Sequence, residues 1–87
     1  MYIVAQHRIK DPARFWSASP QGPGAPRLEA AYPSLDKTEG VCLWVSDSID
    51  ALRDSLDTIV GDSAENTFFE VDAGFAVGLP ERATTGV

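Results

Sequence analysis

Apolar and polar positions divide the chain into segments with different periodicities. Residues 2–7 are mostly apolar or β-branched and residues 41–45 are an unbroken apolar run, and neither segment contains glycine or proline. Runs of this length and composition are typical of strands in the centre of a sheet. Residues 27–32 and 67–71 mix apolar with polar positions, and we interpret them as two further strands.

The segment 49–60 is predicted to form the main helix. Aspartates and an arginine occupy one face of this helix. The apolar side chains recur at helical spacing and form a stripe on the opposite face: Ile49, Leu52, Leu56, Ile59 and Val60. Asp47 or Ser48 can cap the N-terminus, and Gly61 provides the stop.

A second, shorter helix is predicted to begin at Asp11-Pro12 and to continue over residues 13–18. Aspartate is a favourable N-cap, and proline fits the first helical position because its missing N–H costs nothing there. The segment 19–26 is rich in proline and glycine and predicts a loop, long enough to act as a flap. Residues 36–40 predict a hairpin turn, and residues 74–78 a further short strand.

The resulting order of elements is strand, helix, strand, strand, helix, strand. In a chain of 87 residues this order predicts an α+β, ferredoxin-like fold with a four-stranded antiparallel sheet. The two apolar runs fall on its two central strands. We expect residues 1–80 to form one domain and residues 81–87, which lack large apolar side chains, to be a flexible tail.

Both helices of this topology are expected on one face of the sheet. The other face then stays uncovered in a monomer, although apolar faces rarely remain in contact with water. A domain of this size also has a marginal core. We therefore expect a homodimer that pairs two uncovered sheet faces.

The formal net charge is −6 at pH 7, and most carboxylates fall within residues 47–72. A deficit of basic residues argues against nucleic acids and membranes as partners. The single cysteine, Cys42, excludes an internal disulfide and, with no apolar stretch of membrane-spanning length, favours a cytoplasmic location.

His7 is the side chain whose chemistry is easiest to assign, because histidine titrates near neutrality. At the end of its strand it could serve as the catalytic group that transfers a proton to or from a ligand. The alternative is a structural histidine that satisfies a neighbour's hydrogen bond. The faces on which His7, Glu29 and Glu70 lie depend on strand register.

Several further side chains are candidates for ligand binding. The topology brings His7, Tyr32, Cys42 and Asn66 toward one edge of the sheet, and large aromatic rings could line an aromatic pocket. The candidates are Trp16, Tyr32, Cys42, Trp44, Asn66 and Phe68. The simpler interpretation is that the rings are core or interface and that Cys42 is a small buried hydrophobe.

The chain has no phosphate-binding glycine loop, nucleotide fingerprint, nucleophile elbow or zinc signature. We therefore predict no cofactor and no metal site within a single chain. A metal site shared across a dimer axis would double the contributions of His7 and Cys42.

The segment 41–48, the helix after it, Gly61 and residues 69–71 resemble a group of small actinobacterial proteins of unknown function. That group has the dimeric α/β-barrel form of the ferredoxin-like fold and includes a nickel-binding member. The member is rich in histidine, whereas this chain has only His7. The wider superfamily also contains cofactor-free monooxygenases and isomerases of aromatic rings.

Two functional hypotheses follow. The first is a dimer that binds a small apolar or aromatic ligand between sheet and helices. The second is a cofactor-independent monooxygenase or isomerase in which His7 moves a proton on an aromatic substrate. Nickel-type metal binding across the dimer is a third alternative, implied by the resemblance.

Overall fold

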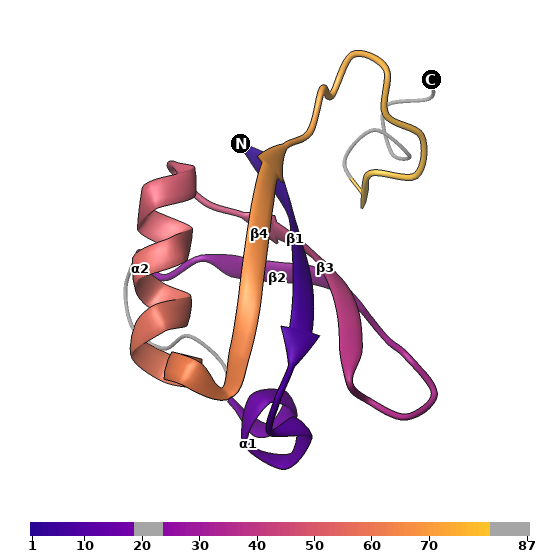
Figure 1. Ribbon diagram of the computed structural model, residues 1–87. Helices are drawn as coiled ribbons and strands as arrows, with labels where there is room; N and C mark the ends of the chain where they lie inside the picture. Colours follow the sequence, from indigo (N-terminus) through magenta and orange to yellow (C-terminus); the bar gives the residue numbers. More distant parts are fainter. Residues whose placement is uncertain (19–23, 81–87) are drawn as a thin grey trace.

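The computed structural model describes residues 1–18 and 24–80 (Figure 1). Its elements in chain order are β1 (Tyr2–Ile9), α1 (Pro12–Ser17), β2 (Arg27–Pro33), β3 (Glu39–Val45), α2 (Ile49–Val60), a 3₁₀ turn η1 (Gly61–Ser63) and β4 (Ala64–Glu70). The strands form one antiparallel sheet in the order β2-β3-β1-β4. This α+β arrangement is compatible with the ferredoxin-like fold, and β1 and β3 are central, as predicted.

Element boundaries differ from the prediction mainly at polar residues. β4 begins at Ala64 and pairs with β1 over its whole length, although residues 65–67 are polar. The predicted short strand at 74–78 is wrong. The Asp72 side chain accepts a hydrogen bond from the Gly74 amide at 2.9 Å, and its carbonyl accepts one from the Phe75 amide at 3.1 Å, so the chain turns there instead.

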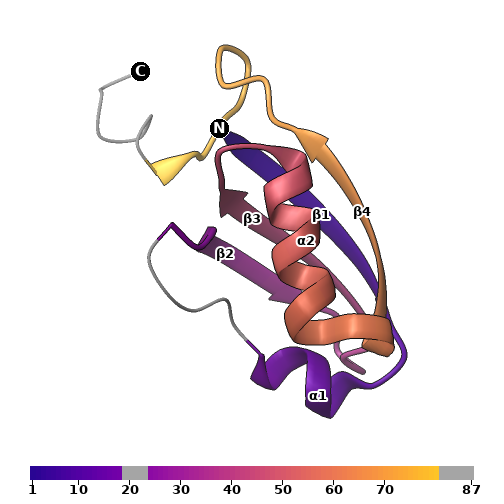
Figure 2. The same ribbon diagram turned by 90° about the vertical axis from the view of Figure 1, so that its left-hand side faces the viewer.

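The main helix, α2, covers one face of the sheet (Figure 2). Ser48 caps it by accepting a hydrogen bond from the Ala51 amide at 3.0 Å. Leu52, Leu56 and Val60 are almost fully buried against the sheet. The predicted stripe is therefore confirmed. We call the face beneath α2 the covered face and the opposite one the open face.

The short helix α1 does not cross the covered face but lies at one end of the sheet, beyond the end of β1 (Figures 1 and 2). Asp11 caps it as predicted, because its carboxylate accepts a hydrogen bond from the Arg14 amide at 3.2 Å. Phe15 is the one buried residue of this helix. Through it, α1 closes the end of the covered face.

The antiparallel register arranges the covered face in rows across β3, β1 and β4. Trp44 lies opposite Ile3, Cys42 opposite Ala5, and Gly40 opposite His7. On the other side of β1, Phe68 lies opposite Ala5 and Asn66 opposite His7. The rows therefore change from large apolar side chains at one end to His7 and Asn66 at the end near α1.

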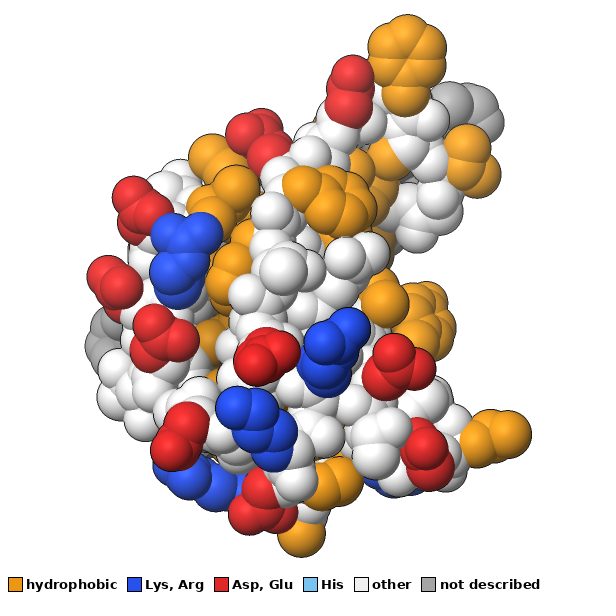
Figure 3. Space-filling model, in the orientation of Figure 1, with side chains coloured by type: hydrophobic (Ala, Val, Ile, Leu, Met, Phe, Trp, Pro, Cys, Tyr) orange, Lys and Arg blue, Asp and Glu red, His pale blue; other side chains and the backbone are white. Residues whose placement is uncertain are grey.

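The open face also changes character along the strands. Its row nearest α1 is charged and places Arg8 between Glu39 and Glu65, each directly opposite on a neighbouring strand. The next row is mixed, and the row after it is apolar, with half-buried or exposed Val4, Leu43 and Phe69. Figure 3 shows acidic and basic side chains interspersed over the lower part of the view, at the end where α1 lies.

Two sequence predictions fall outside the described residues: most of the loop at 19–26, since only residues 24–26 are described, and the tail at 81–87. Residues 72–80 turn to the side of the sheet opposite α2 (Figure 1). Leu79, within this segment, is buried. Within the described part of the chain, no helix is long and apolar enough to cross a membrane.

Candidate functional site

His7 lies on the covered face, in the row nearest α1. Strand alternation places it with Ile3 and Ala5, and its side chain is only 5% exposed. The ring of Phe15 in α1 lies against the imidazole, with ring centroids 4.6 Å apart. The only histidine of the chain is thus buried between the sheet and the short helix.

Asn66 is the polar partner of this histidine. Its Oδ1 lies 2.6 Å from Nδ1 of His7, across the β1–β4 pair. Burial lowers the pKa of His7 below its usual 6.5, because a protonated ring at this position lacks the hydration that it would have in water. The hydrogen bond to Asn66 raises the pKa and only partly opposes this effect. The imidazole is therefore neutral at pH 7.

The second ring nitrogen, Nε2, is buried and has no hydrogen-bond partner among the described residues. Buried polar atoms in native proteins are almost always paired, so an unpaired one calls for an explanation. Trp44 Nε1 and Ser63 Oγ are in the same situation. Trp44 lies on the covered face as well, two rows from His7.

Trp16 closes the space beside His7 from the α1 side. Its indole lies against the backbone of Gly40, where an added Cβ would come within 2.8 Å of Cη2. Its Nε1 donates a hydrogen bond to the carbonyl of Lys37 at 3.1 Å. The ring also packs edge-on against Phe15, with centroids 4.9 Å apart. Gly40 therefore makes room for Trp16 directly opposite His7.

The structure brings together some of the predicted site residues. His7 and Asn66 are in contact, and Trp16 reaches them through Phe15. Cys42, Trp44 and Phe68 share the covered face and belong to or pack against the core. Burial raises the pKa of the Cys42 thiol to about 11, so this thiol stays protonated and is not a nucleophile.

Tyr32 does not join this group. It pairs with Val41, on the open face, and is 69% exposed. Sequence reasoning placed it at the correct end of the sheet but could not assign its face. Conversely, it missed Phe15 and Gly40 as site residues. Phe15 carried a usable signal, because it is the apolar residue beside Trp16 at the start of a capped helix.

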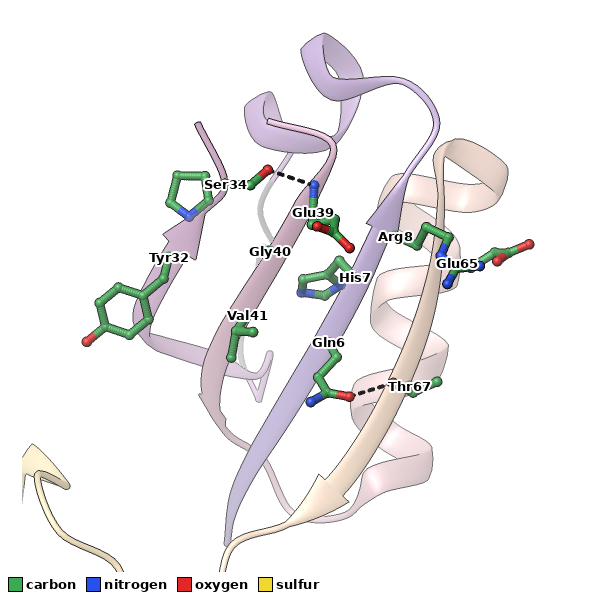
Figure 4. Close-up of a pocket in the computed structure, with 11 residues that line it drawn as sticks. Gln6, His7, Arg8, Tyr32, Ser34, Glu39, Gly40, Val41, Glu65 and Thr67 are labelled. Atoms are coloured by element: carbon green, nitrogen blue, oxygen red, sulfur yellow. Dashed lines mark hydrogen bonds between the residues drawn. The ribbon is translucent and has the colours of Figure 1, made fainter. Parts of the chain in front are cut away.

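A separate concavity of about 660 Å³ lies on the open face (Figure 4). Its lining includes Gln6, Arg8, Glu39, Tyr32 and Thr67, together with the backbone of the strands. The His7 ring points away from it, since strand alternation puts that ring on the other face. Thr67 donates a hydrogen bond to Gln6 at 3.3 Å. No described side chain that faces this concavity has a buried, unpartnered polar atom.

The two locations differ in their buried polar atoms. The described side chains that face the open-face concavity, such as Gln6, Glu39 and Thr67, have no buried polar atom without a partner. The His7 nitrogen is sealed from water and lacks a partner within the described chain. A buried unsatisfied atom is the stronger indication of a missing ligand atom.

Searches with the chain found no matching family model, no matching curated protein and no matching solved structure. Within residues 1–18 and 24–80, no group of three or more histidine, cysteine or acidic side chains lies close enough to hold a metal ion.

Proposed function

We propose that this protein binds a small aromatic molecule on the covered face of its sheet, beside His7, and that it does so as a homodimer. The observation that carries the proposal is the buried Nε2 of His7, which has no hydrogen-bond partner among the described residues. Leaving such an atom unpaired costs about 1–3 kcal/mol, and a bound ligand would remove this cost.

The surroundings of His7 favour an aromatic ligand. Phe15 and Trp16 already make tilted and edge-on ring contacts at this end of the sheet. A flat ring entering beside them would gain the same type of contact. In the neighbouring row the small residues Ala5 and Cys42 face the same side as His7. Entry requires Trp16 to move away from Gly40, because its ring occupies that space in the described structure.

An NMR titration with 1-naphthol tests this location. The side-chain amide of Asn66 reports on the covered face, and that of Gln6 reports on the open face. We expect the Asn66 signals to shift and the Gln6 signals to stay. The substitution His7→Ala should weaken binding at least fivefold, whereas the control Gln6→Ala should leave it within twofold. Shifts confined to Gln6 would move the site to the open face, and the absence of any shift would remove the proposal.

A cofactor-independent reaction is the second candidate. A neutral imidazole with an unprotonated nitrogen beside an aromatic ligand can act as a general base. The lowered pKa of His7 favours this role, since it keeps the base unprotonated at pH 7. Oxygen uptake with 1-naphthol that depends on His7 would support an oxygenase. Binding without turnover would leave the protein as a binding module.

The dimer is supported by the open face. Val41, Tyr32 and Phe69 are between 41% and 69% exposed on it. The charged row contains both signs, with Arg8 between Glu39 and Glu65. In a two-fold symmetric pair the same surface meets itself, so Arg8 of one copy can approach a glutamate of the other. A second copy therefore suits this face better than a uniformly charged partner.

We retain as part of the proposal the resemblance to small actinobacterial dimeric α/β-barrel proteins. The α+β fold of the chain is compatible with the ferredoxin-like arrangement of that group. The site gives no support to nickel binding, because the single buried histidine is bonded to an amide and the Cys42 thiol is protonated.

A further inference from the structure

The contact between Asn66 and His7 fixes where the imidazole carries its proton. The Oδ1 atom of Asn66 is a carbonyl oxygen and can only accept a hydrogen bond. At a separation of 2.6 Å, Nδ1 of His7 must therefore be the donor. In a neutral imidazole the other nitrogen then has no hydrogen, so Nε2 presents a bare lone pair.

The neutral form is the one this environment supports. His7 contacts the amide of Asn66 and the ring of Phe15, neither of which is charged. The residues opposite and beside it on the covered face are Gly40 and Ala5, and no described ion pair reaches the ring. Nothing there compensates an imidazolium, so burial keeps the ring neutral.

We infer that the ligand of this site is a neutral aromatic molecule that donates a hydrogen bond, a phenolic hydroxyl or a heteroaromatic N–H, to Nε2 of His7. This inference rests on the proposed function and names its ligand class. A ketone, an ether or an ester offers only acceptor atoms, so Nε2 would still lack a hydrogen-bond donor when such a molecule is bound. A carboxylate has no proton to donate at pH 7, and an ammonium group would lose its hydration in a buried site.

Asn66 acts in this scheme as a positioning residue. Its Oδ1 contacts Nδ1 of His7 and holds the proton on that nitrogen. Nε2, on the far side of the ring, is then left as an acceptor that requires a hydrogen-bond donor. The residue that sets ligand polarity is thus on β4, whereas the residue that meets the ligand is on β1. Removing the Asn66 acceptor should leave the apolar contacts in place and weaken the preference for a donor.

Four probes with the same double ring test the inference: 1-naphthol, which can donate; 1-methoxynaphthalene and 1-acetylnaphthalene, which can only accept; and naphthalene. Calorimetric titration of the full chain at pH 7.5 should show 1-naphthol binding roughly three- to tenfold more tightly than the other three. The variants His7→Phe and Asn66→Leu should each reduce this preference to less than twofold while naphthalene still binds. Two variants are used because one of them could fail to fold, which circular dichroism would reveal.

The outcomes separate this inference from the function beneath it. If all four probes bind the natural chain equally, or an acceptor probe binds best, the donor class is wrong and the aromatic site stands. If Asn66→Leu folds and keeps the full preference, the role of Asn66 is overturned. If none of the probes binds, the proposed function fails and the inference fails with it.

Discussion

The buried imidazole of His7 couples the stability of the protein to pH. Its pKa in the folded state lies below the usual 6.5, which an unfolded chain retains. As pH falls, the unfolded state therefore takes up a proton before the folded state does. The stabilisation linked to His7 is complete well above pH 6.5 and is lost as pH falls from 6.5 toward the folded-state pKa, below which the loss levels off.

Urea unfolding at pH 7.5 and pH 5.5 measures this effect. We expect the free energy of unfolding to fall over this interval by at most about 1.4 kcal/mol per pH unit, the limit for one proton. The matched control is His7→Phe, which removes the only histidine of the chain and should be insensitive over the same range. Hydrogen bonds from Thr38 and Ser34 lower the pKa of Asp36 to about 2, so its contribution is lost only at much lower pH.

A natural chain that is equally stable at pH 7.5 and pH 5.5 would contradict a neutral buried His7. The same conclusion would follow if His7→Phe showed the full pH dependence of the natural chain. In that case other groups, rather than the imidazole, would be titrating.

At the scale of elements, the packing of Trp16 in α1 against β3 depends on the absence of a side chain at Gly40. A Cβ at this position would approach Cη2 of Trp16 to 2.8 Å, which is too close for any real contact. The substitution Gly40→Ala should therefore displace the indole, break its hydrogen bond to the Lys37 carbonyl and destabilise the fold by about 1–3 kcal/mol.

A double-mutant cycle with Trp16→Ala isolates this clash. In the Trp16→Ala background the added methyl group meets no indole, so Gly40→Ala should cost less than half as much by urea unfolding. Equal costs in both backgrounds would show that α1 does not rest on Gly40 in solution.

The sequence was sufficient to predict elements whose local signals agree with their packing. The stripe from Ile49 to Val60, its cap at Ser48 and the stop at Gly61 predicted α2 because burial, capping and glycine geometry all indicate the same helix. Central placement of β1 and β3 followed from their apolar runs. The segment 74–78 was mispredicted because an apolar run between glycines resembles a strand, whereas the Asp72 hydrogen bonds that turn the chain leave no periodic signal.

The site was less accessible to sequence reasoning, for a physical reason. Which face a strand residue occupies depends on pairing register, and a one-residue shift reverses it. His7 and Asn66 were placed at the same edge correctly, but their direct pairing required the β1–β4 register. The same uncertainty grouped Tyr32 with them, although it lies on the open face.

At the scale of the whole molecule, the open face predicts self-association. Sedimentation velocity at about 50 µM should give a species of twice 9.4 kDa. Because Val41 lies within the proposed interface, the substitution Val41→Glu should shift the protein toward the monomer. The control Leu35→Glu adds the same charge at a fully exposed hairpin residue and should leave the dimer intact.

A monomer at this concentration would refute the dimer. If Val41→Glu and Leu35→Glu had the same effect, the interface would not be the open face. Neither result would alter the assignment of the His7 site, since that site lies on the opposite side of the sheet.

The most direct test of the central claim is a long-range ¹H–¹⁵N NMR spectrum of the His7 imidazole at pH 7.5, without ligand. The account predicts a neutral ring with its proton on Nδ1, where Asn66 accepts it, and an unprotonated Nε2. Addition of 1-naphthol should then shift Nε2 as it accepts a hydrogen bond. A proton on Nε2, or a doubly protonated ring at this pH, would contradict the account.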